Sequence, residues 1–168
     1  MKLKATIITL TAALGLTISA HANIGDTLKQ SQARYHSKGE SIENGKGVHF
    51  YYKGWSIDEA FNVDGRCDFI MYSKGNKADM SAEEVAACLS ANNPSGLEWQ
   101  AYNGNPNNAF TWQIENTLFA MWYVSGWVND KTGATGTRQT VRIATRNALI
   151  ALGWMPGNQE TTATSVPL

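Results

Sequence analysis

Apolar and polar side chains alternate from Val48 to Tyr72, in a stretch that reads VHFYYKGWSIDEAFNVDGRCDFIMY. Alternation with a period of two is typical of β-strands, whose successive side chains point to opposite faces. Gly54 and Gly65 interrupt the pattern where tight turns would fall. We therefore predict three antiparallel strands joined by two turns, and we expect the rest of the chain to be arranged around this meander.

The turns determine the register of the meander. A two-residue turn at Lys53-Gly54 stacks aromatic and β-branched side chains on one face. The facing pairs it predicts are Tyr52 with Trp55, Phe50 with Ile57, and Val48 with Glu59. For the second turn we expect a three-residue loop, Val63 to Gly65, because it keeps the apolar side chains together. This loop predicts two further pairs, Phe61 with Cys67 and Ile57 with Met71.

Two helices are predicted from their capping signals. Thr27 and Gln30 have the spacing of a capping box, which indicates a short helix from Leu28 to about His36. Ser81 and Glu84 repeat the signal before an apolar stripe, and we expect this second helix to lie across the apolar face of the meander.

The second half of the chain predicts further strands. Residues 97–102 and 139–145 have strand patterns, and residues 109–128 predict a hairpin that turns at Glu115-Asn116. Residues 147–154 are apolar and fit either a helix or a strand. The expected hairpin pairs are Trp112 with Phe119 and Phe110 with Met121.

These elements together predict an α+β fold. We expect antiparallel β-meanders of about six to seven strands, with two or three helices packed on one side. The order of helix, strands, helix and further strands hints at a duplicated plan.

The first 22 residues have the pattern of a secretory signal peptide. Lys2 and Lys4 precede an apolar run, and Ala20-His21-Ala22 is a small-x-small cleavage site. We predict cleavage after Ala22 and a periplasmic or extracellular location. Length then predicts a single domain over residues 23–155, followed by a disordered tail over residues 156–168.

Charge and hydropathy exclude several partners. The chain has 14 basic and 14 acidic side chains, and cleavage of the signal peptide would remove two of the lysines. The slightly acidic remainder gives no reason to expect nucleic acid or an anionic membrane as partner. The apolar run near the start is too short to predict a transmembrane segment, and no Cys follows the cleavage site to carry a lipid.

Export changes the interpretation of the two cysteines. In an oxidising compartment Cys67 and Cys88 favour a disulfide, which would contribute roughly 3 kcal/mol in the chain-entropy model. The alternative is two separate buried thiols. No metal site is predicted, because neither the cysteines nor the histidines have ligand spacing, and no cofactor motif is present.

The stretches IGDTLKQSQARY, YKGWSIDEAFNVDGRCDFIMY and EEVAACL carry a resemblance. Their spacing resembles uncharacterised secreted bacterial proteins that have a G-x-T helix, an R-Y pair and a G-x-x-I…F…G-x-C strand pair. It is also similar to the helix-plus-meander unit of small outer-membrane-assembly lipoproteins and of the β-lactamase-inhibitor-like fold. The resemblance covers Ile24 to about Trp99 and implies a binding or scaffolding module. It does not imply a lipid anchor, because the acylated Cys of those lipoproteins is missing.

The meander suggests a weak set of catalytic candidates. Its register places His49 opposite Asp58, with Ser56 as a diagonal neighbour, which invites comparison with a hydrolytic triad. A triad also needs an oxyanion hole and a cleft, and no G-x-S-x-G motif is present. An ordinary surface His–Asp pair is the competing interpretation.

Aromatic side chains of the second half are the stronger functional signal. On residues 117–128 both strand faces are apolar, so the strand is either buried on both sides or leaves one row exposed. If one row is exposed, we expect it to bind a protein or to stack on a cell-wall glycan. The expected binding residues are Leu118, Trp122, Val124, Trp99 and Trp154.

These observations predict a secreted or periplasmic binding module, with an inhibitor, an immunity-like protein or an envelope accessory factor as examples. The first alternative is a cell-wall-directed hydrolase that uses His49 and Asp58. The second is a structural envelope protein. Whether the chain is an enzyme stays open, with the balance against it.

Overall fold

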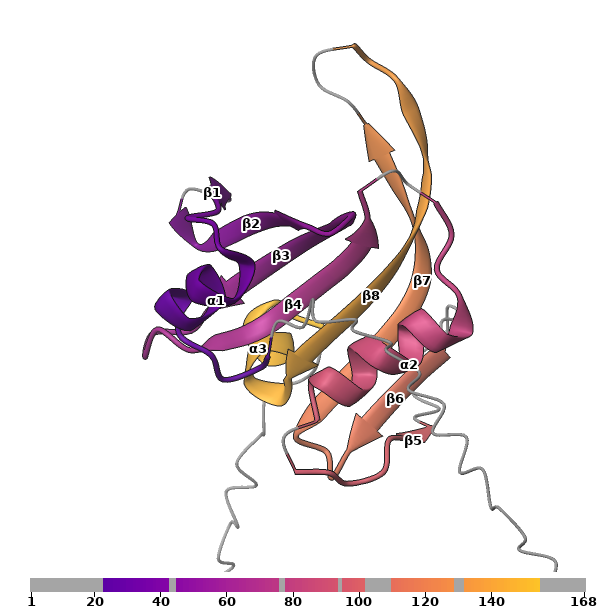
Figure 1. Cartoon of the computed structure of the whole chain (residues 1–168). Helices are drawn as coiled ribbons and strands as arrows, with labels where there is room; N and C mark the ends of the chain where they lie inside the picture. The colour runs from indigo at the N-terminus through magenta and orange to yellow at the C-terminus, as the bar shows by residue number, and fades with distance from the viewer. Residues whose placement is uncertain are drawn as a thin grey trace, which may run out of the picture.

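The computed structural model describes residues 23–42, 45–75, 78–93, 95–101, 110–128 and 132–154. Over these residues the chain forms one eight-stranded antiparallel sheet and three helices (Figure 1). The elements, in order, are α1 (Leu28–Tyr35), β1 (Glu40–Ile42), β2 (Gly47–Tyr52), β3 (Trp55–Phe61), β4 (Cys67–Lys74), α2 (Ala82–Ala91), β5 (Gln100–Ala101), β6 (Phe110–Ile114), β7 (Leu118–Val128), β8 (Thr135–Thr145) and α3 (Arg146–Ala151).

The predicted α+β class is confirmed, although the sheet has more than the six to seven strands expected. Both capping boxes are also confirmed. The Thr27 and Ser81 side chains accept from the backbone N–H groups of Gln30 and Glu84, whose own side chains return to the cap backbone. Residues 147–154, which fitted a helix or a strand, contribute to α3.

A duplicated plan governs the order of strands in the sheet. The order is β1-β2-β3-β4-β8-β7-β6-β5, so one helix followed by four strands occurs twice. The last strands of the two meanders, β4 and β8, pair at the centre with Ile70 opposite Ile143. Because Glu59 lies opposite Ile70 and Ala120 lies opposite Ile143, Glu59 and Ala120 occupy equivalent positions in the two halves.

The helices lie on both faces of the sheet, which corrects the prediction that they pack on one side. Tyr35 of α1 and Val85 of α2 belong to the main core, whereas Ala148 of α3 packs with Phe119 in a second cluster. Figure 1 shows α1 over β2 and β3, α2 over β6 to β8, and α3 behind the sheet. The second helix therefore covers the second half of the sheet rather than the predicted meander, which α1 covers.

The first hairpin has the predicted register. Tyr52 pairs with Trp55, and the ladder continues through Phe50 with Ile57. Lys53 and Gly54 both adopt positive φ, which the two-residue turn requires.

The second hairpin confirms one predicted pair and corrects another. Phe61 pairs with Cys67, as the three-residue loop predicts. A bulge at Asp68 then shifts the register, so Ile57 pairs with Tyr72 and not with Met71.

The bulge also changes which side chains of β4 join the main core. Cys67, Ile70 and Tyr72 are buried there, whereas Phe69 faces α3. Met71, which the predicted pair with Ile57 placed on the same face as Cys67, instead lies opposite Asp58.

The hairpin of β6 and β7 differs from the prediction by one residue. Ile114 pairs with Leu118, so Trp112 lies opposite Ala120 instead of Phe119, and Phe110 lies opposite Trp122 instead of Met121. The cause is a three-residue turn in which Glu115 and Asn116 both adopt left-handed φ. Neither is a glycine, so the longer turn had no signal in the sequence.

Within the described part of the chain, no helix is both long enough and apolar enough to cross a membrane. The predicted signal peptide, residues 1–22, lies outside the described residues, as does the predicted tail, residues 156–168.

Candidate functional site

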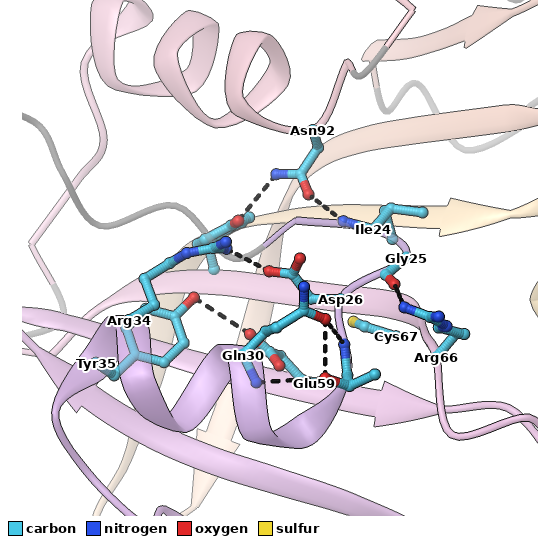
Figure 2. Close-up of polar contacts among 12 residues, drawn as sticks. Ile24, Gly25, Asp26, Gln30, Arg34, Tyr35, Glu59, Arg66, Cys67 and Asn92 are labelled. Carbon is cyan, nitrogen blue, oxygen red and sulfur yellow. Dashed lines mark hydrogen bonds and ion pairs between the residues drawn. The ribbon is translucent and has the colours of Figure 1, made fainter.

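A buried carboxyl group lies beneath α1. Glu59 points from β3 into the main core and is only 1% exposed. The hydroxyl of Tyr35, on the inner face of α1, donates a hydrogen bond of 3.2 Å to Glu59 Oε1 (Figure 2). Ser31, one turn earlier on the same face, is also buried. The helix therefore covers the carboxyl group with polar side chains instead of the usual apolar stripe.

Burial dominates the electrostatics of this group. Loss of solvent raises the pKa of Glu59 above its ordinary value, while the nearby hydroxyls of Ser31 and Tyr35 lower it. The same burial raises the pKa of Tyr35, and the proximity of Glu59 raises it further. Glu59 Oε2 and Ser31 Oγ have no hydrogen-bond partner among the described residues. Burial therefore shifts the balance of Glu59 toward its neutral form.

The segment before α1 closes this cluster. Asp26 forms an ion pair of 2.6 Å with Arg34 of α1 (Figure 2). The backbone of the same segment joins β4, because Gly25 N–H donates to Cys67 O and Cys67 N–H donates to Asp26 O, each at 2.7 Å. Arg66 adds a side-chain bond to Gly25 O at 3.3 Å. These contacts hold α1 and the start of β4 together.

Asn92 connects the two halves of the molecule at the end of α2. It is fully buried, and its Oδ1 accepts from Ile24 N–H at 3.1 Å. Its Nδ2 donates at 2.9 Å both to the hydroxyl of Tyr72 and to Cys88 O. Figure 2 shows Asn92 above the segment that leads into α1. The hydrogen bonds of Asn92 therefore hold the end of α2 against β4 and against the segment that leads into α1.

The catalytic candidates are only partly brought together. His49 Nδ1 and Asp58 Oδ1 form the predicted pair on neighbouring strands. His49 Nε2, however, is buried and has no hydrogen-bond partner among the described residues, so it does not contact Ser56, which is itself buried. A triad needs that contact to activate the hydroxyl. The three residues are therefore not assembled as a nucleophilic site.

The predicted binding residues do not form one surface. Leu118 is buried, and Trp122 and Trp99 pack against the main core. The indole of Trp99 donates to Leu89 O at 3.1 Å, which is a structural contact. Trp154 lies on the other face of the sheet, edge-on to Phe69. Among the predicted binding residues on the face that α1 and α2 cover, only Val124 is well exposed, at 63%.

That exposed valine lies on a part of the hairpin that leaves the sheet. β4 pairs with β8 only over residues 140–144, and β6 pairs with β7 only over residues 118–122. Residues 124–128 and 135–139 therefore pair, within the described part of the chain, only with each other. We call these two segments the projecting ribbon, and Figure 1 shows them reaching beyond α2.

The two faces of the projecting ribbon differ. One face carries the exposed Val124 and Val128, at 63% and 65%. On the other face, where the ribbon joins the sheet, the guanidinium of Arg142 lies over the ring of Tyr123, at 4.6 Å from the ring centroid. Trp154 stacks on the same guanidinium at 4.9 Å. Burial raises the pKa of Tyr123, and the nearby guanidinium groups lower it. The sequence left open whether this strand is buried on both sides or exposes one row, and the row with Trp122 was the expected binding row if one is exposed.

Trp127 lies on the Tyr123 face and covers the opposite strand at Gly136. A Cβ atom at position 136 would lie 2.7 Å from the Trp127 ring, so only glycine allows this contact. The aromatic side chain thereby stiffens a two-stranded ribbon that has no third strand in the described part of the chain.

The predicted disulfide is not formed. Cys67 and Cys88 are both free and both buried in the main core. Burial raises the pKa of Cys67 well above its ordinary value and that of Cys88 to about 12, so both thiols stay protonated and unreactive. Among the described residues, no group of three His, Cys, Asp or Glu side chains is placed to hold a metal ion.

Glu59 and the arginines of β8 are the residues that sequence reasoning missed. Glu59 had a signal, because the predicted register placed this carboxylate on the same strand face as Trp55 and Ile57. Arg138 and Arg142 had no comparable signal, since exposed arginines on a strand are common.

Comparison with protein-family models, with characterised proteins and with solved structures finds no match for this chain.

Proposed function

We propose that this protein is an exported binding module that contacts a protein partner through the projecting ribbon. The observation that carries the proposal is a two-stranded ribbon that pairs with no other described strand and exposes Val124 and Val128. An isolated two-stranded ribbon is only marginally stable in water, and exposed apolar side chains in a row usually mark a contact surface. A partner that packs on the valines would bury both.

The composition supports a partner that is neither nucleic acid nor membrane. Basic and acidic side chains are equal in number over the whole chain. Export, with cleavage after Ala22, is the location that the first 22 residues favour, and it places the partner in the cell envelope or outside the cell.

A pair of matched variants tests the proposal. Val124→Asp with Val128→Asp places charges on the valine face, while Val63→Asp changes a fully exposed valine in the turn between β3 and β4. Each protein is immobilised, exposed to an envelope extract and analysed by quantitative mass spectrometry. We expect wild type and Val63→Asp to retain the same protein and the double variant to lose it. Equal retention by all three proteins would contradict the proposal.

The alternatives make different predictions. A cell-wall-directed hydrolase that uses His49 and Asp58 loses its activity on peptidoglycan in a His49→Ala variant and is indifferent to Val124. A structural envelope protein is indifferent to both changes. The geometry at His49 Nε2 supports neither alternative over the binding module.

A further inference from the structure

The face opposite the valines concentrates hydrogen-bond donors where the projecting ribbon joins the sheet. Tyr123 lies opposite Thr140 on the paired strand, and the two arginines lie opposite the residues on either side, Arg138 facing Ser125 and Arg142 facing Met121. The three side chains therefore stand on one face, with each arginine two ladder positions from Tyr123 and four positions from the other arginine. Burial raises the pKa of Tyr123, and both guanidinium groups are near enough to its hydroxyl to oppose that rise.

These donors lack acceptors. The Tyr123 hydroxyl, Arg138 Nε and Arg142 Nε are buried atoms without a hydrogen-bond partner among the described residues. A guanidinium group has no lone pair to accept with, so the arginines cannot satisfy each other. Leaving a buried donor without a partner costs free energy comparable to a lost hydrogen bond, and native proteins seldom leave several together.

Among the described residues, neither arginine has an ion-pair partner. The ion pairs found among the described residues lie elsewhere, at Asp26 with Arg34, His49 with Asp58 and Lys74 with Glu84. Two cations that both act on Tyr123 also repel each other, and an anion between them would relieve that repulsion.

Arg142 is held in place before any ligand arrives. Its guanidinium lies over the rings of both Tyr123 and Trp154, at 4.6 Å and 4.9 Å from the ring centroids, and Trp154 is edge-on to Phe69. A side chain that is already ordered loses little conformational entropy when it binds. Stacking on its faces leaves the edge of the guanidinium, which carries the N–H groups, as the direction from which a ligand approaches.

We propose that Arg138, Tyr123 and Arg142 form a carboxylate-binding site that receives acidic side chains of the protein partner. The planar donor fork of arginine matches a carboxylate in a bidentate pair, and the tyrosine hydroxyl supplies a further donor. An acidic protein segment is the source we assign, because the site lies on the reverse face of the same ribbon that exposes Val124 and Val128. The inference rests on the proposed function, because it requires that the same partner contacts both faces of the ribbon.

The test uses an acetylated hexaglutamate peptide as probe, with a hexaserine peptide and inorganic phosphate as the other arms. Binding to the full chain at low salt is followed by backbone amide shifts in NMR and by the fluorescence of Trp154 and its neighbours. We expect hexaglutamate to shift the amides around Tyr123 and Arg142, with hexaserine inactive and phosphate much weaker. Arg138→Gln and Arg142→Gln should each weaken hexaglutamate binding about tenfold or more. Lys46→Gln, which removes an exposed cation just before β2, should leave it unchanged.

Arg142→Lys separates charge from geometry. It keeps the cation and loses the fork, so we expect binding intermediate between wild type and Arg142→Gln. Amide spectra of the free variants show whether each retains the wild-type fold.

The proposal is overturned if hexaglutamate does not bind, if folded Arg138→Gln and Arg142→Gln variants bind it as tightly as wild type, or if phosphate binds as tightly as hexaglutamate. These failures are distinguishable from failure of the proposed function. That function is tested by the valine face, where both arginines are retained.

Discussion

The two halves of this molecule have the same order of helix and strands, but the side chains beneath the helix are polar in the first half and apolar in the second. Each half is a capped helix followed by four strands, and the strands meet at Ile70 and Ile143. At equivalent positions beneath the helices the first half buries Glu59 and the second half buries Ala120, at 1% and 2% exposure. Four residues after each N-cap the buried side chain is Ser31 in the first half and Val85 in the second.

The difference shows how each half is held. The first half joins its helix to the sheet through a polar network that includes Tyr35, Asp26 and Arg34. The second half joins its helix through Val85, Cys88 and Leu89, in the ordinary way of an amphipathic helix. The second half alone extends two of its strands, β7 and β8, beyond the sheet. The polar half therefore anchors the fold, and the apolar half carries the surface that we assign to binding.

The largest effect is expected when the acidic side chain of the first half is introduced at the equivalent position of the second half. Ala120→Glu places a carboxylate beneath α2, whose sequence contains no tyrosine or arginine to take the place of Tyr35 and Arg34. We expect a loss of about 3–5 kcal/mol in the free energy of unfolding, measured by urea denaturation, because the charge is buried without a partner. The matched control, Val124→Glu at an exposed position, should change stability by less than about 0.5 kcal/mol. Equal effects at the two positions would show that the second half is not apolar beneath its helix.

Truncation of the helix stripe comes next in size. Leu89→Ala leaves a cavity under α2 and should cost about 2–5 kcal/mol at every pH. Tyr35→Phe, at the equivalent distance from the other N-cap, removes the donor to Glu59 Oε1 and should cost about 1–3 kcal/mol, more at neutral than at acidic pH. Unfolding curves at two pH values measure both. A pH-dependent loss for Leu89→Ala would contradict the assignment of polar and apolar halves.

Neutralising the buried acid should have a smaller and opposite effect. The pKa of Glu59 is raised in the folded state, so the folded protein holds the proton to higher pH than the unfolded chain does. Its contribution to stability is therefore complete below the unfolded-state pKa and falls as the pH rises through the raised folded-state value. Glu59→Gln removes this fall and should stabilise the protein at neutral pH by on the order of 1 kcal/mol.

The readout is the difference in unfolding free energy between Glu59→Gln and wild type as a function of pH. The difference should be small in acid and should grow toward neutral pH. Tyr35 can still donate to the amide oxygen of the substituted side chain, and the unpartnered Ser31 Oγ can accept from the NH₂ group of that amide. A variant that is less stable than wild type at neutral pH would show that the carboxylate is charged and stabilising.

The smallest difference is expected where the halves agree. Thr27→Ala and Ser81→Ala each remove a capping box, and each should cost about 1 kcal/mol. Circular dichroism on chemical denaturation compares the two. A cap that matters in one half only would indicate that the two helices are held differently even at their ends.

Local signals in the sequence were sufficient where backbone chemistry is explicit. Lys53-Gly54 specified the first hairpin to the residue, and the two capping boxes specified the starts of both helices. In each case a residue type with a particular φ or a particular side-chain acceptor determines the local geometry.

The remaining features depend on contacts that alternation alone does not encode. The bulge at Asp68 and the left-handed Glu115 and Asn116 shift two registers without any glycine or proline to announce them. The placement of α3 on the far face follows from how Thr145 caps it directly after β8. The exposed row of β7 was uncertain in the sequence because both of its faces are apolar, and only the ends of β4 and β6 decide where the hairpin leaves the sheet.

Site-specific photo-crosslinking tests the central claim most directly. A photoreactive phenylalanine analogue is placed at position 128 on the projecting ribbon and, in a separate protein, at position 63 in the turn between β3 and β4, both strongly exposed. Each protein is expressed in its own cell and illuminated. The account predicts a crosslinked protein of defined mass from position 128 that is absent from position 63. Identical products from the two positions, or none from position 128, would contradict it.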